Sequence, residues 1–178
     1  MATKKTSMFT LTDRLTIAAN ATDTRAVIDL GSYVDVGDRQ ALQIHSVDYV
    51  FQGTTASNDA WQSTTSDASV IVQVADLNRG GLVFANDRAL VSSGVLGIPA
   101  NAQYHQESDL YPDNYGKGAD DGRFVVNDAL YVTGRITGGL DTANNATINV
   151  TVRVNASIVT LSQKDFMAIA IQSTAADN

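Results

Sequence analysis

Residues 147–158, TINVTVRVNASI, alternate apolar and polar side chains without a break. The apolar positions are Ile148, Val150, Val152, Val154, Ala156 and Ile158, and the polar ones between them are Asn149, Thr151, Arg153, Asn155 and Ser157. A period of two is typical of a β-strand with one face on a core and the other in water. This stretch therefore predicts a long strand near the end of the chain and favours a β domain.

Several segments that precede residue 147 in the chain show the same period of two. In 9–17 the apolar residues fall on alternate positions, interrupted at Asp13, and 25–30 (RAVIDL) resembles a short second strand. Residues 69–75 (SVIVQVA) place three valines on one face, and 123–136 (RFVVNDALYVTGRI) resumes strand character. Each of these segments predicts a half-buried strand.

The segment 40–52, QALQIHSVDYVFQ, changes phase in its middle. Its apolar residues lie at Leu42 and Ile44 and then shift to Val47, Tyr49 and Phe51. A strand keeps both halves on one core across such a shift only through an inserted residue, so the pattern predicts a β-bulge near His45 and Ser46.

Polar stretches separate the predicted strands. Residues 53–69 predict a long surface loop anchored by Trp61, and 101–122, dense in Asp, Gly and Tyr, predict an exposed loop. The glycine-punctuated region 76–100 predicts short strands joined by tight turns.

The last predicted element has two interpretations. Ser162 followed by Asp165 resembles a capping box with Asp in place of Glu, and Phe166, Ile169 and Ala170 follow at helical spacing. A short C-terminal helix satisfies this pattern, and so does a final strand through 167–172 (MAIAIQ).

These elements predict an all-β fold in one domain spanning 1–178. Roughly eight to ten strands without βα alternation are typical of an antiparallel β-sandwich of jelly-roll type. The chain has 178 residues, enough for one sizeable core, and no cysteine, so neither disulfides nor a thiolate metal site contributes to its stability.

Charge and composition argue against nucleic acid and membranes as partners. The net charge is −7, and Lys4 and Lys5 are the only closely spaced basic pair, too few for a strong nucleic-acid-binding arm. No segment has the apolar length of a secretory signal or a membrane span. We expect a soluble protein made in the cytoplasm of its host cell, without membrane insertion.

The sequence lacks the common catalytic signatures. There is no nucleophile elbow, P-loop, dinucleotide fingerprint or HExxH motif. The only histidines, His45 and His105, have no neighbouring carboxylate and serine arrangement that would make either a catalytic base. We therefore expect no enzymatic activity and no cofactor.

Two groups of loop residues are candidates for binding, the carboxylates for a metal ion and the aromatic residues for another molecule. The carboxylates offer oxygen ligands for Ca²⁺, but their spacing does not match an EF-hand, and a solvated acidic loop explains them as well. The aromatic residues favour contact with another molecule. The carboxylates are Asp109, Asp113, Asp120 and Asp121, and the aromatic residues are Trp61, Tyr104, Tyr111 and Tyr115.

Three blocks carry a resemblance to a known family. FTLTDRLTIAAN (9–20), IDLGSYVDVGDRQALQIHSVDYVFQ (28–52) and TINVTVRVNASIVTLSQKDFMAIAIQS (147–173) resemble, in order and strand style, the single jelly-roll capsid proteins of tailless icosahedral viruses of bacteria and archaea. The likeness spans most of the chain but rests on pattern and size, because that family has no diagnostic motif.

The resemblance implies a major coat protein of a virion, whose partners are copies of itself and other coat proteins. Segments 1–8 and 173–178 would tie capsomers together, and 56–69 with 101–122 would be exposed loops. Without a basic arm, the inner surface would meet an internal membrane or another protein.

Two alternatives stay open. A decoration, tail or fibre module would form trimers or tubes without closing a shell. A carbohydrate-binding β-sandwich would stack sugar rings on Trp61, Tyr104, Tyr111 and Tyr115, so its glycan binding would fail when Trp61 or Tyr111 becomes Ala. Assembly of a coat protein would instead fail when the terminal segments are deleted.

Overall fold

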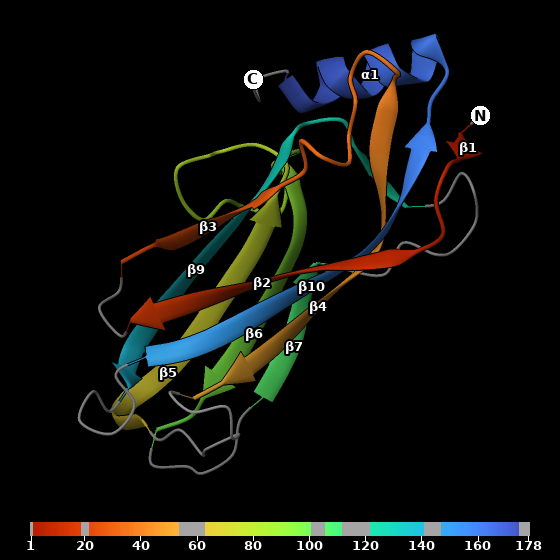
Figure 1. The fold of residues 1–178 in the computed structure, drawn as a ribbon. Coiled ribbons are helices and arrows are strands. Elements are labelled where there is room, and N and C mark those ends of the chain that lie inside the picture. The colour runs from red at the N-terminus through yellow and green to blue at the C-terminus, as the bar shows by residue number, and fades with distance from the viewer. Residues whose placement is uncertain are drawn as a thin grey trace.

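The computed structural model describes residues 2–18, 22–53, 63–100, 106–111, 122–140 and 147–174 (Figure 1). These parts of the chain form ten strands and one helix. The elements are β1 (Thr3–Lys4), β2 (Phe9–Ala18), β3 (Thr24–Asp29), β4 (Gln40–Gln52), β5 (Ser63–Ala75), β6 (Leu90–Ile98), β7 (Gln106–Tyr111), β8 (Arg123–Val125), β9 (Ala129–Leu140), β10 (Thr147–Thr160) and α1 (Gln163–Thr174).

The strands form two antiparallel sheets with a nested order. Sheet A has the order β1-β10-β4-β8, with β2 also paired to β10, and sheet B has the order β3-β9-β5-β6-β7. The pairs β2–β10, β3–β9, β4–β8 and β5–β6 enclose one another along the chain and fall alternately in sheet A and sheet B. This is the order of a jelly roll, so the predicted all-β sandwich of jelly-roll type is confirmed.

The alternating stretch that predicts the longest strand lies inside sheet A. β10 pairs with β2 on one side and with β4 on the other. Its apolar residues from Ile148 to Ile158 point into the sandwich, and five of them, Ile148, Val150, Val152, Val154 and Ala156, are fully buried. The period of two therefore reports the two environments of this strand, core on one face and mostly polar partners on the other.

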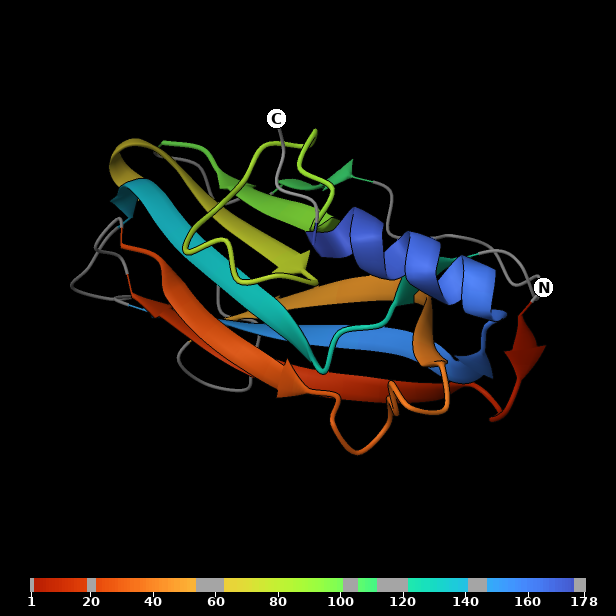
Figure 2. The ribbon, with the colours of Figure 1, turned by 90° about the horizontal axis from the view of Figure 1, so that it is seen from above.

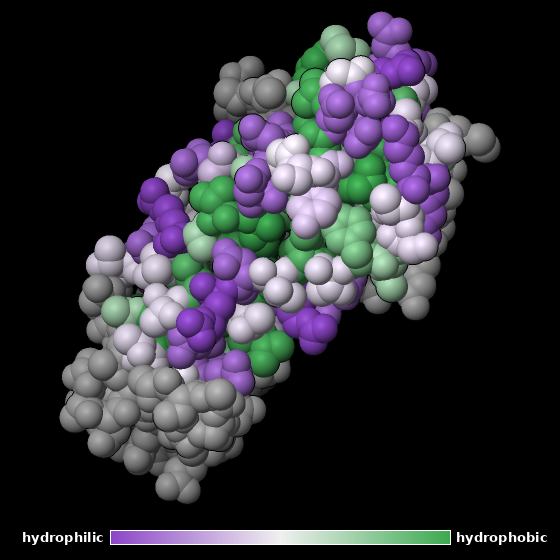
Figure 3. Space-filling view, in the orientation of Figure 1, coloured by the Kyte–Doolittle hydropathy of each residue, from purple (hydrophilic) through white to green (hydrophobic). Residues whose placement is uncertain are grey.

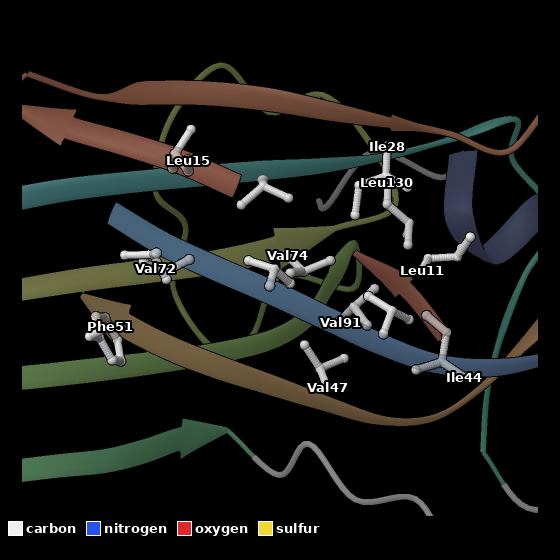
Figure 4. Packing of buried hydrophobic residues seen from close by; sticks show 14 of the residues in the cluster. Leu11, Leu15, Ile28, Ile44, Val47, Phe51, Val72, Val74, Val91 and Leu130 are labelled. Carbon is white, nitrogen blue, oxygen red and sulfur yellow. The ribbon is translucent and has the colours of Figure 1, made fainter. Parts of the chain in front are cut away.

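The two sheets pack face to face around one aliphatic core. Figure 2 shows the two layers from above, and Figure 4 shows side chains from both layers meeting between them. Strands β2, β4 and β10 supply one side of the core, and β3, β5, β6 and β9 supply the other. Labelled members in Figure 4 are Leu11, Leu15, Ile28, Ile44, Val47, Phe51, Val72, Val74, Val91 and Leu130.

Small residues let the sheets approach closely at two places. A Cβ on Gly134 of β9 would lie 2.8 Å from Leu15 Cδ2 and would also clash with Ile17. A Cβ on Gly94 of β6 would lie 2.8 Å from the ring of Tyr49, whose hydroxyl donates to Ser92 Oγ at 2.9 Å. Glycine at these positions is a packing requirement, because an added methyl group would overpack the core.

The predicted bulge in 40–52 is present. Ser46 pairs with Asn155 and Ile44 with the next residue, Ala156, so His45 is the extra residue of β4. Leu42, Ile44, Val47 and Phe51 are all buried despite the change of phase. The inserted residue thus keeps both halves of β4 on the core.

Two loop predictions were wrong in part. Residues 63–69 belong to β5, where Ala68 pairs with Ile98 of β6 and Gly138 of β9. Within 101–122, residues 106–111 form β7 at the edge of sheet B. Both segments are polar strands, which carry no apolar alternation, and their backbone pairing alone defines them.

The region 76–100 contains one strand rather than several. β6 runs unbroken from Leu90 to Ile98, although Ser92, Ser93 and Gly94 sit in its middle and are buried. The sequence pattern fails here because small residues replace large apolar ones where Tyr49 crosses from the opposite sheet. The segment 76–89 is a loop.

The C-terminal pattern forms a helix, which decides between the two interpretations. Ser162 Oγ accepts a hydrogen bond from the Asp165 backbone N–H at 3.2 Å and donates to Asp165 Oδ2 at 2.7 Å. Phe166 is buried in a second, smaller cluster on sheet A that includes Ala41, Val126, Val159 and Leu161. In the described part of the chain, no helix has the length and apolar character needed to cross a membrane.

Candidate functional site

The interior of the sandwich is occupied by its own side chains. The core-facing residues of β4, β5 and β10 are almost all below one-tenth exposed, and Tyr49 reaches across to Ser92. Among the described residues, no three His, Cys, Asp or Glu side chains gather as a metal site. Functional surfaces of this chain therefore have to be sought on the outside of the jelly roll.

Most of the predicted binding residues lie outside the described residues. These are Trp61, Tyr104, Tyr115, Asp113, Asp120 and Asp121, and the histidine His105 also lies outside the described residues. Asp109 and Tyr111 belong to β7, where their backbones pair with Gly94 and Ser93 of β6. The calcium and sugar-stacking interpretations of these loops stay predictions.

The other histidine belongs to a buried polar cluster on sheet A. His45 Nε2 lies 3.0 Å from Ser157 Oγ, which also donates to Gln43 Oε1 at 3.3 Å. A serine beside a histidine is the first half of a nucleophilic site. Ser157 and Gln43 are nevertheless almost fully buried, and this cluster joins β4 to β10 at the bulge.

Asparagines on the outer face of sheet A form cross-strand hydrogen bonds. Thr10 and Thr16 of β2 donate to the side-chain oxygens of Asn155 and Asn149 at 2.7 Å each. The Asn155 amide then donates to Ser46 Oγ of β4 at 2.9 Å. These contacts link β2, β10 and β4 and account structurally for the Asn-x-Thr/Ser patterns in β10.

An ion pair and two hydrogen bonds join both ends of the 76–89 loop to β8 and to the connection between β8 and β9. Arg123 Nη2 donates to Asp76 Oδ2 at 2.9 Å and also to the Arg88 carbonyl oxygen. Asn127 donates to the Asp76 carbonyl oxygen at 2.7 Å. Asp76 is only 2% exposed, and its Oδ1 has no hydrogen-bond partner among the described residues. Burial raises the pKa of the Asp76 carboxyl although Arg123 opposes this shift.

Three chain segments meet at one end of the jelly roll, which we call the helix end. β1 pairs with β10 through Thr3–Thr160 and Lys4–Val159, and Lys5 forms an ion pair with Asp38 at 3.8 Å. The Leu161 N–H donates to the Arg39 carbonyl oxygen, which places the start of α1 beside the loop between β3 and β4. Figure 1 shows the N-terminal strand and α1 at this same end.

The helix end exposes apolar side chains from all three segments. On α1, Met167 and Ile171 are 53% and 62% exposed and lie one turn apart on the same face. Met8, Tyr33 and Val36 are also exposed, and the Tyr33 ring stacks on Phe9 with 5.4 Å between centroids. In Figure 3 hydrophobic residues reach the surface where α1 lies. The sequence did not predict this surface, because its prediction requires knowing which face of α1 packs on sheet A.

Comparison with known proteins finds structural similarity only. No family model matches the chain, and no curated protein matches it. VP1 of Merkel cell polyomavirus in complex with GD1a oligosaccharide is 7% identical, with 90% of this chain and 98% of that chain covered and a TM-score of 0.47. VP1 of the Trichodysplasia spinulosa-associated polyomavirus is 10% identical, with 90% and 99% covered and a TM-score of 0.47.

A second structure of Merkel cell polyomavirus VP1, as an unassembled pentamer, is 8% identical over 90% of this chain and 98% of that chain, with a TM-score of 0.47. The jelly-roll fold of this chain follows from its own strand order and register. These polyomavirus proteins give no support to the bacterial or archaeal host that the sequence resemblance implies.

Proposed function

We propose that this chain is a coat protein subunit that associates with copies of itself to build a virion shell. The fold is compatible with this role, since jelly rolls form capsid domains as well as lectins and cupins. The proposal includes a location in the virion, other coat proteins as further partners and no enzymatic activity. Bacterial or archaeal hosts, and contact of the inner surface with an internal membrane, belong to the same proposal.

The observation that carries the proposal is the apolar surface of the helix end. Met8, Val36, Met167 and Ile171 are each more than half exposed and come from three segments of the chain. Exposed large apolar side chains are more frequent on surfaces that bind other proteins than on the rest of a protein surface, so we propose that these side chains mark a contact surface. In a chain with a net charge of −7, uniform charge would oppose association, so apolar contact is the attraction available to identical subunits.

The terminal segments are proposed to contribute to the same contacts. β1 is joined to β10 by two paired residues, and both of its residues are exposed. Residues 5 and 6 continue this attachment, since the Lys5 and Thr6 N–H groups donate to the Ile158 carbonyl oxygen and Thr6 Oγ1 accepts from the Ile158 N–H. Segments 1–8 and 173–178 are proposed to tie neighbouring capsomers, as the sequence resemblance implies.

The proposal is tested by placing one charge on the exposed face of α1. Ile171→Glu should abolish association in light scattering and size-exclusion chromatography, because assembly would bury that carboxylate in an apolar contact. Thr12→Glu is the matched control, since Thr12 is exposed on the outer face of β2 and the change adds the same charge. Unchanged association of Ile171→Glu, or equal loss in both variants, would contradict the proposed contact surface.

A further inference from the structure

A small cavity lies on the outer face of sheet B, away from the helix-end surface. It has a volume of about 70 Å³ and lies between β3, β9 and the loop that follows β5. Its floor includes Val27, Ala75, Tyr131 and Thr133. Arg25 from β3 and Arg79 from the loop also line it. The cavity is therefore lined by two arginines, a tyrosine and a threonine together with apolar side chains.

The 76–89 loop covers one side of the cavity, and contacts with Gln73 of β5 and with Asp23 hold this loop in place. The Gln73 side chain donates to the Val83 carbonyl oxygen and accepts from the Val83 N–H, both at 2.8 Å. Gly81 comes so close to Asp23 that a Cβ would lie 2.9 Å from Oδ2. Figure 2 shows this loop, in yellow-green, passing over β9. These contacts preform the cavity, which lowers the entropic cost of binding.

Among the described residues, one of the three arginines near the cavity has no hydrogen-bonded or ion-paired carboxylate. Arg79 Nε lies 3.0 Å from Asp87 Oδ2, and Arg135 Nε lies 2.6 Å from Asp23 Oδ1. Arg25 is exposed and, in the described part of the chain, its guanidinium forms no hydrogen bond or ion pair. Its charge is nevertheless near enough to Asp23 to help the Arg135 hydrogen bond lower the pKa of that carboxyl. The two aspartates thus balance two of the three arginines, and a single negative charge would neutralise the third.

We propose that this cavity binds a carboxylate group, which Arg25 holds together with Thr133 and Tyr131. A guanidinium matches the planar, two-oxygen geometry of a carboxylate. A monoanion matches the single unpaired charge better than a phosphate dianion does. The apolar floor formed by Val27 and Ala75 accommodates the short carbon substituent of the acid. The ligand is a small free acid or a carboxylate side chain of another copy of this chain.

The test is the shift in thermal unfolding midpoint caused by sodium acetate. The protein is heated in 100 mM sodium acetate and in sodium chloride of the same ionic strength, and acetamide serves as the neutral analogue. A ligand that binds only the folded state raises the midpoint. We expect acetate to raise it and acetamide to leave it unchanged.

Variants at Arg25 assign the effect to the cavity. Arg25→Gln should weaken acetate binding about tenfold and remove most of the shift, since it deletes a charge-assisted hydrogen bond. Arg25→Lys should keep part of the acetate-induced shift, because it keeps the positive charge. Arg153→Gln, an exposed arginine on sheet A, is the matched control and should keep the full shift. An equal shift in Arg25→Gln and the unchanged protein, or a shift with acetamide, would overturn the proposal.

The association of Arg25→Gln distinguishes the two sources of the carboxylate. If this variant loses the acetate effect and associates normally, the ligand is a free acid. If it loses both, the carboxylate belongs to another copy of the chain. The acetate shift is a property of the single subunit, so a failure of the proposed coat function would leave it intact.

Discussion

The buried pair Asp76–Arg123 yields the sharpest stability prediction. Arg123→Met removes the cation that donates to Asp76 Oδ2 at 2.9 Å but keeps much of the side-chain stem. Asp76 is 2% exposed, and one of its oxygens already has no partner in the part of the chain that the structure describes, so the variant leaves a carboxylate buried and uncompensated. Removing one partner of a buried pair costs about 3–5 kcal/mol, and we expect a loss in that range at pH 7.5.

The loss should depend on pH with a defined sign. Burial raises the pKa of Asp76 in the folded protein, so between its ordinary and its raised pKa the folded state binds more protons than the unfolded state. In that window the contribution of Asp76 to stability increases as pH falls. Arg123 opposes the shift, so its removal raises the pKa of Asp76 further. The loss in Arg123→Met should therefore be smaller at pH 4.5 than at pH 7.5.

Urea unfolding followed by far-UV circular dichroism at both pH values measures this difference. Arg153→Met is the control for the loss of an exposed arginine and should change stability by less than about 0.5 kcal/mol. The double variant Arg123→Met with Asp76→Asn should recover part of the loss, because no buried charge remains. A loss below about 1 kcal/mol, or one that is equal at both pH values, would refute the role assigned to the pair.

Three further changes test the packing and capping. Gly134→Ala places a methyl group against Ile17 and should lower the free energy of unfolding by about 1–3 kcal/mol in urea; an unchanged midpoint would show that the sheets separate freely there. Ser162→Ala removes the helix cap and should cost about 1 kcal/mol, measured the same way. Tyr49→Phe leaves the buried Ser92 hydroxyl unpaired and should cost about 1–3 kcal/mol, whereas adding Ser92→Ala should restore part of it. Strict additivity of the last two changes would contradict that hydrogen bond.

The fold could be predicted where the two faces of a strand differ in environment. β10 alternates because one face lies on the core and the other carries polar cross-strand contacts. The bulge at His45 was predictable for the same reason, since a change of phase is visible only when a strand has a buried face. The helix α1 could not be distinguished from a strand by spacing alone, and the contact of Phe166 with sheet A decided it.

Other features could not be predicted from the sequence, because they depend on contacts between residues that are far apart in the chain. β7 and the start of β5 are polar, so only pairing with their neighbours defines them as strands. The ion pair between Asp76 and Arg123 joins residues 47 positions apart, and no local sequence pattern predicts it. The exposed face of α1 and the cavity beside Arg25 likewise become visible only once the sheets are in place. Most of the loop residues that the sequence favoured for binding lie outside the described residues, and Asp109 and Tyr111 belong to β7.

The size distribution of the purified full chain tests the central claim most directly. Light scattering with negative-stain microscopy of the same sample should show closed shells or regular multi-subunit capsomers, because the helix end offers apolar surface to identical subunits. A strict monomer across protein concentration and salt would contradict self-association and, with it, the proposed coat function.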